Sequence, residues 1–269
     1  MYFATPIPYP PIIVCPTSLM SEETSNQTES KKALSDSKSR LYRLWILGLR
    51  LTIGFFILTI LWVVVLKWMP IYGTPLMVIR KIEAYRQGKP SSVAYRWVAY
   101  NQISDFAKVA VVASEDQRFP QHSGFDWDAI KQAIEDNKHR KVKRGASTIS
   151  QQVAKNVFLW NGRNYVRKGL EAYFTFLIEH IWGKRRILEV YLNVAEMGDM
   201  VFGVEAASQQ YFKKSAAQIH ATEAATLAAI LPSPRRWSVY PPSIVVAQRR
   251  NHVLYQMQLL GGIYYLKSL

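Results

Sequence analysis

The chain has 269 residues, 49% of them hydrophobic, and a formal net charge of +15, which suits one domain with an anchor or two small domains. Such a charge attracts polyanions, whether nucleic acid, anionic lipid head groups or phosphorylated substrates. The only cysteine is Cys15, which excludes an intramolecular disulfide and a thiolate metal cluster.

The amino-terminal part is proline-rich up to about residue 20 and polar from there to residue 43. It shows neither helical nor strand periodicity in its first twenty residues, so we expect residues 1–43 to form a disordered tail. Translation could begin at Met1 or at Met20, which opens the polar stretch, and the sequence leaves both starts open.

A long apolar run at residues 44–69 contains only two charges, Arg50 and Lys67. It reaches the roughly 20 residues that a helix needs to cross a bilayer, and buried core helices are rarely so long or so uniformly apolar. Lysines and arginines crowd its amino-terminal flank, so the positive-inside rule places the amino terminus in the cytoplasm and the rest outside. No small-x-small cleavage pattern follows, which favours an uncleaved, single-pass signal anchor over a signal peptide.

The remaining chain is expected to be a connecting segment, residues 70–95, and one mainly α domain, residues 96–269. Apolar residues at helical spacing, with capping or stop residues, predict seven helices. These cover residues 106–114, 126–137, 147–157, 165–182, 186–196, 204–212 and 222–231. The sequence contains no internal repeat, nucleotide-binding glycine loop or metal-ligand motif.

Two adjacent acids, Glu115 and Asp116, stand at the end of the first of these helices. They follow an apolar run and precede Phe119 and an aromatic-rich loop. A carboxylate there could have the raised pKa that a general acid or base needs. An ordinary acidic helix end is the more common explanation for an isolated pair of this kind.

A polar string follows at Gly145–Asn156, with Ser147, Gln151, Gln152 and Lys155 in it. Gln151 and Lys155 are four residues apart, so they share a helix face that suits sugar hydroxyls and a phosphate better than an apolar core. The alternative is simply a well-capped helix.

A third string contains Arg163, Arg167, Lys168 and Glu171. Arg167 and Glu171 are also four residues apart, so a surface salt bridge is one explanation. The other is that Glu171 faces a cleft as a second carboxylate, with the cations holding a charged leaving group.

Together these strings resemble the peptidoglycan glycosyltransferase family (glycosyltransferase family 51), particularly its stand-alone, monofunctional biosynthetic members. EDxxFxxHxGxD, GxSTxxQQxxKN and RKxxE are matched at Glu115–Asp126, Gly145–Asn156 and Arg167–Glu171. ILExYLNxxxxG is matched at Ile187–Gly198, and a fifth string at Gly203–Lys214 agrees with one residue of slack. The resemblance covers about residues 90–260 and shows no departure at the catalytic positions.

The resemblance implies a mainly α, lysozyme-like glycosyltransferase domain with a small membrane-associated lobe, preceded by one transmembrane helix. The basic stretch at residues 137–144 falls where that lobe would lie. In this family a growing glycan on its lipid pyrophosphate is the donor and lipid II is the acceptor. A single in-line displacement then inverts the anomeric carbon. The expected location is the bacterial inner membrane, with the domain on the periplasmic side.

Residue roles follow from the same resemblance. Glu115 would be the general base, and Glu171 would lie near the donor's pyrophosphate and sugar. Lys155 and Arg163 would bind the leaving pyrophosphate, which needs neutralising charge more than a proton. The other substrate-binding candidates are Ser147, Gln151, Gln152, Asp116, Arg167 and Lys168. A divalent cation (Mg²⁺ or Mn²⁺) could assist, but no metal-ligand spacing in the sequence demands one.

Three other functions compete with this one. A lysozyme-type hydrolase would also use a glutamate on an α domain, but it would not need the cations Lys155 and Arg163. A non-catalytic cell-wall scaffold could dispense with Glu115 and Glu171. Nucleic-acid binding fits the charge but not the outward-facing topology. The expected partners are lipid II, the glycan strand, membrane lipids and other cell-wall synthesis or division proteins. After residue 260 too little chain remains for a transpeptidase domain.

Overall fold

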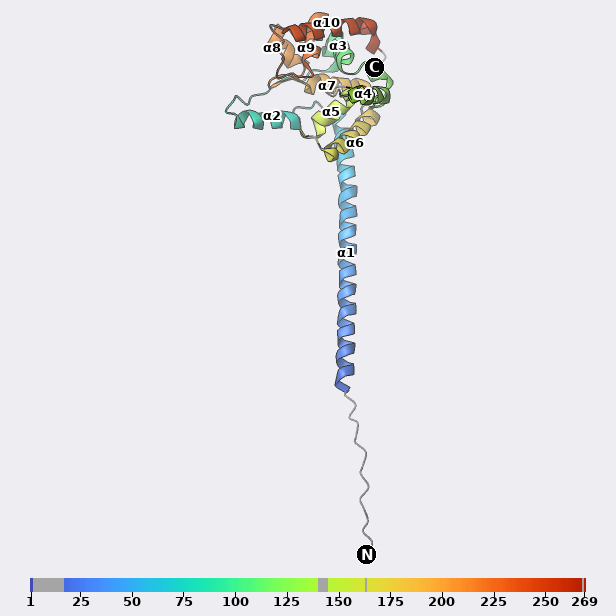
Figure 1. Cartoon of the computed structure of the whole chain (residues 1–269). Coiled ribbons are helices and arrows are strands. Elements are labelled where there is room, and N and C mark those ends of the chain that lie inside the picture. The colour runs from blue at the N-terminus through green and yellow to red at the C-terminus, as the bar shows by residue number, and fades with distance from the viewer. Residues whose placement is uncertain (2–16, 140–144, 163, 268) are drawn as a thin grey trace. The chain divides into compact units, whose positions relative to one another are not determined.

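The structure is a computed structural model that describes residues 1, 17–139, 145–162, 164–267 and 269 (Figure 1). It divides into two compact units, Met1–Thr59 and Ile60–Leu269. The described residues are mostly helical with little strand, as the sequence predicted.

A single long helix, α1 (Thr17–Leu66), occupies the amino-terminal part. Its segment Tyr42–Leu66 has 25 residues and a mean hydropathy of 2.4, so it is long and apolar enough to cross a membrane. The helix begins far earlier than the disordered tail expected up to residue 43, and the structure corrects that expectation for residues 17–43. The polar stretch after Met20 contains no proline or glycine that would stop a helix.

A second correction concerns residues 70–95, which contain a helix as well as connecting chain. Helix α2 (Pro75–Arg86) starts after Thr74, whose side chain accepts a hydrogen bond from the Met77 amide at 3.3 Å. Pro75 is compatible with this helix, because proline at the first helical position has a suitable φ and loses no intrahelical hydrogen bond.

The seven predicted helices are all present, each within two residues of its expected bounds. They are α3 (Asp105–Glu115), α4 (Trp127–His139), α5 (Ile149–Phe158), α6 (Tyr165–Ile181), α7 (Lys184–Val194), α8 (Val204–Phe212) and α9 (Ala221–Ile230). The sequence did not predict α10 (Ile244–Leu259) or three short 3-10 helices, η1 (Tyr100–Gln102), η2 (Phe119–Gln121) and η3 (Gly262–Leu266).

A small sheet has the strand order β1 (Ala94–Tyr95), β3 (Val201–Phe202), β2 (Glu196–Gly198). β1 runs parallel to β3, and β2 runs antiparallel to it. Gly203, directly after β3, has a φ of 81°, and a Cβ there would clash with the backbone carbonyl of Asn193 on α7. Only glycine therefore allows this close approach.

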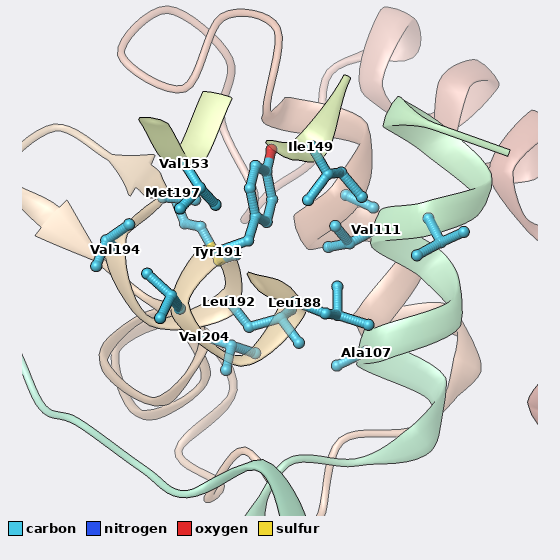
Figure 2. Close-up of a cluster of buried hydrophobic side chains, with 14 of the residues drawn as sticks. Ala107, Val111, Ile149, Val153, Leu188, Tyr191, Leu192, Val194, Met197 and Val204 are labelled. Carbon is cyan, nitrogen blue, oxygen red and sulfur yellow. The ribbon is translucent and has the colours of Figure 1, made fainter. Parts of the chain in front are cut away.

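The core of the unit Ile60–Leu269 lies between two groups of helices. α3 packs against α9 and α10, α5 packs against α6, and α7 contacts both groups. Figure 2 shows Val111 of α3 facing Ile149 of α5, with the Tyr191 ring between Ile149 and Val153. Because Val112, Ile149 and Leu188 are fully buried, α3, α5 and α7 are held together by close packing.

Candidate active site

The acidic end of α3 is tied to the start of α5 by Asp116. Its carboxylate accepts hydrogen bonds from the Ile149 amide at 2.9 Å and from His122 Nε2 at 2.9 Å. Asp116 is buried, and an unpaired buried carboxylate would be costly, so these contacts hold the end of α3 against the start of α5 and against His122. The structure thus gives Asp116 a positioning role; its role in substrate binding stays a prediction.

Glu115, the last residue of α3, is partly buried and faces Gln152 on α5. Gln152 Nε2 donates a hydrogen bond to Glu115 Oε2 at 2.9 Å. Gln152 Oε1 in turn accepts one from the hydroxyl of Tyr191 on α7 at 3.2 Å. Three helices therefore hold one carboxylate through a side-chain hydrogen-bond network.

Burial raises the pKa of the Glu115 carboxyl above its ordinary value. The hydrogen bond from Gln152 and the positive charge of Arg249 lower that pKa, and the charge of Asp116 raises it. A carboxylate with a raised pKa is a stronger base, which suits abstraction of a proton from a hydroxyl group.

Two clefts meet at Glu115. One has a volume of about 310 Å³, and its lining includes Asp126 and Asp128 near the start of α4. The other has a volume of about 720 Å³, and its lining includes Arg249 and His252 of α10. Since Glu115 lines both, a group bound in either cleft can reach its carboxylate.

Lys155, one turn beyond Gln152 on α5, is partly buried. Burial lowers its pKa, while the negative charges of Glu171 and Glu115 raise it. Within the described ranges, no hydrogen bond or ion pair joins the Lys155 ammonium to another residue. A cation without a partner in a partly desolvated position is suited to bind an anion.

Glu171 on α6 has both carboxylate oxygens occupied. Arg167 Nη1 donates to Oε2 at 2.7 Å, and Lys168 Nζ pairs with Oε1. Arg167 also donates from Nε to the Gly162 carbonyl at 2.6 Å. Glu171 and Arg167 are buried, so the pair is more than the surface salt bridge considered from the sequence.

The remaining predicted site residues differ in burial and in whether they line a cleft. Ser147 is exposed and lines both clefts. Gln151 is buried and forms a capping box with Thr148, with its Oε1 accepting from the Thr148 amide at 3.0 Å. Neither cleft is lined by Lys155 or Glu171. Arg163 lies outside the described residues.

Sequence reasoning missed Tyr191, Arg249 and His252. Arg249 and His252 belong to α10, a helix that the sequence did not predict. A signal was available, because its buried residues Val246 and Val253 recur at helical spacing. Tyr191 lies inside a motif, but only the packed structure aims its hydroxyl at Gln152.

The fold and the site fit one class: a mainly helical group-transfer enzyme, with a carboxylate suited to act as a base and a nearby cation suited to bind an anionic group. The transglycosylase family model matches residues 81–258 of the chain. The chain therefore belongs to the transglycosylase family.

Curated relatives agree with this assignment. A biosynthetic peptidoglycan transglycosylase of Chromohalobacter salexigens is 50% identical over 217 residues, which cover 81% of this chain and 93% of that protein. One of Pseudomonas syringae pv. syringae is 51% identical over 211 residues, covering 78% of this chain and 89% of that protein. One of Pseudomonas fluorescens is 52% identical over 215 residues, covering 80% and 90%.

Proposed function

We propose that this chain polymerises the glycan strands of peptidoglycan for cell-wall synthesis, with lipid II as the acceptor and the growing lipid-linked strand as the donor. The family assignment and the biosynthetic relatives support this reaction. Glu115 carries the proposal, because its carboxylate has a raised pKa, is held by Gln152 and lies where two clefts meet.

In the proposed reaction Glu115 takes the proton from the acceptor sugar hydroxyl. The hydroxyl oxygen then forms a bond to the donor's anomeric carbon as the bond from that carbon to the pyrophosphate oxygen breaks. The pyrophosphate leaves with the electron pair, and the single displacement inverts the anomeric carbon. Gln152 orients the base by its hydrogen bond, and the two clefts offer one site to each sugar chain.

The leaving pyrophosphate gains negative charge in the transition state, so fixed cations stabilise it. Lys155 is the candidate within the described part of the chain, because its ammonium has no partner there and Glu171 is near enough to raise its pKa. Arg163 remains a second candidate on the grounds of its motif position alone. Glu171 holds Arg167 and Lys168 and so shapes the charge around Lys155.

The candidate span Tyr42–Leu66 supports single-pass anchoring in a membrane. We propose that the amino terminus is cytoplasmic, that the membrane is the bacterial inner membrane and that the domain acts on its outer side, where the positive-inside rule would place it. Other cell-wall synthesis or division proteins are proposed partners.

The test is polymerisation of labelled lipid II by the detergent-solubilised full chain, comparing wild type, Glu115→Gln and Glu135→Gln. Glu135 is an exposed acid on α4 whose ion pair among the described residues is with Lys138, so its variant is a matched control. We expect polymer from wild type and Glu135→Gln, and none from Glu115→Gln.

Two other outcomes would reject the proposal. Shortening of a preformed glycan strand without synthesis would identify a lysozyme-type hydrolase. A folded wild-type protein that binds lipid II but makes no polymer would identify a scaffold.

A further inference from the structure

Helix α2 buries one face and leaves an apolar face exposed. Leu76 and Met77 are buried against Phe202 of β3. Val78, Ile82 and Tyr85 are 55%, 46% and 79% exposed. Their spacing of four and then three residues places them in one stripe along the helix.

The charges on the exposed side of α2 are positive. Lys81 and Arg86 are exposed and lie within one turn of Ile82. The only acid of the helix, Glu83, pairs with Arg80 at 2.7 Å and with Arg235 at 3.7 Å. The stripe is therefore flanked by cations whose charge no acid of α2 is free to neutralise.

The chain between α1 and α2 is short and pinned to the domain. From Leu66 to Pro75 it can span at most about 30 Å, even when fully extended. The Leu66 carbonyl accepts a hydrogen bond from Arg186 Nη2 at 2.9 Å, and the Ile71 carbonyl accepts one from the Tyr95 hydroxyl. α2 therefore starts within this distance of the end of the candidate membrane span.

The connecting chain itself carries exposed aromatic residues. Trp68 and Tyr72 are 70% and 75% exposed, and Lys67 lies over the Trp68 ring at 5.3 Å. Tryptophan and tyrosine are enriched at the interface between membrane and water, where an apolar ring and a polar group are both accommodated.

We propose that α2 is an interfacial membrane helix that lays its Val78, Ile82 and Tyr85 stripe onto an anionic lipid surface. An amphipathic helix of this kind buries its apolar face about 5–10 Å into the head-group boundary, and lysine and arginine at its edges attract anionic lipid. Together with the span Tyr42–Leu66, α2 gives the domain a second membrane contact, which restricts its tilt over the bilayer.

The test places a polarity-sensitive fluorophore on one cysteine of the full chain, in a Cys15→Ser background, as Cys15 is the only natural cysteine. The probe sites are Ile82→Cys and, as a control, Tyr255→Cys, which is 57% exposed on α10. Figure 1 shows α10 and α2 on opposite sides of their unit. The protein is reconstituted at one chain per nanodisc, with or without phosphatidylglycerol, and with spin-labelled lipid as quencher.

We expect blue-shifted emission at position 82 in phosphatidylglycerol discs, with quenching at least about twofold stronger than at position 255. Equal quenching and equal emission at the two positions would overturn the proposal. A blue shift at position 82 that appears only in concentrated detergent solution, and not in the discs, would also overturn the proposal. It would mean that a second copy of the chain, rather than lipid, covers the stripe.

A charge test separates attraction to anionic lipid from simple burial. Lys81→Glu with Arg86→Glu should reduce the quenching at position 82 in phosphatidylglycerol discs to about the level of neutral discs. Lys213→Glu with Lys267→Glu makes the same change in charge at exposed sites elsewhere and should have no effect. Loss of quenching in the control pair, or none in the α2 pair, would contradict the proposed lipid chemistry.

Discussion

Gln152 donates a hydrogen bond to the carboxylate of Glu115 at 2.9 Å, across 37 residues of sequence. This contact joins the end of α3 to α5, and Glu115 lines both clefts. The contact favours the charged carboxylate, whereas burial disfavours it. The balance between these two effects sets the pH range in which Glu115 can act as a base.

Gln152→Leu should raise the pKa of Glu115, because it removes a donor that stabilises the carboxylate. A base must be deprotonated, so the acidic limb of the kcat/KM profile should move to higher pH. The control is Gln210→Leu, at an exposed position on α8. An unchanged acidic limb in Gln152→Leu would show that another group limits the rate at low pH.

Glu115→Gln should make the protein more stable at neutral pH. Because burial raises the pKa of Glu115, its stabilising contribution is full below the ordinary glutamate pKa and is lost as pH rises through the folded-state pKa. Replacing the charged form with a neutral amide should raise Tm by roughly 2 °C at pH 7. Thermal unfolding at several pH values checks this, and the gain should vanish at low pH.

Lys155→Met should lower kcat/KM by roughly 10²- to 10³-fold, because it removes a fixed charge from the leaving group. Tm should not fall, since Lys155 has no partner among the described residues and burial already disfavours its charge. Lys213→Met, at an exposed site, is the control. A large fall in Tm would instead indicate a structural role for Lys155.

Glu171→Gln should be strongly destabilising, by roughly 3 kcal/mol, because it leaves the buried Arg167 without its counter-charge. Lys168→Ala should cost less than about 1 kcal/mol, because the lysine side chain is 49% exposed. Thermal unfolding of both variants in detergent measures the difference. Equal losses would mean that the two ion pairs contribute equally despite their different burial.

Removal of divalent cations tests whether Mg²⁺ or Mn²⁺ assists the reaction, since the sequence demands no metal but leaves such assistance open. The described residues contain no group of three or more His, Cys, Asp or Glu side chains that could hold a metal ion. We expect EDTA to leave Tm unchanged and to lower the polymerisation rate by less than about tenfold, because Lys155 already supplies positive charge. Complete loss of activity, restored by Mg²⁺ or Mn²⁺, would contradict this.

Local patterns in the sequence predicted seven helices within two residues, because caps, breakers and apolar spacing act over only a few residues. The motifs also identified Glu115, Lys155 and Glu171 as candidate residues for catalysis and pyrophosphate binding. The helix α10 was missed because its chain was judged by its position after the last motif rather than by its periodicity. Helix α2 was missed because residues 70–95 were expected to be a connecting segment.

Only the tertiary structure decided which of two neighbouring glutamines contacts Glu115. The sequence placed Gln151 with Lys155 on a face for substrate, but Gln151 caps its own helix and Gln152 holds Glu115. Helical spacing states which residues share a face, but not what lies opposite that face. Only the packing of α3, α5 and α7 around Tyr191 brings these distant side chains together, because those contacts depend on how the helices pack and not on local spacing.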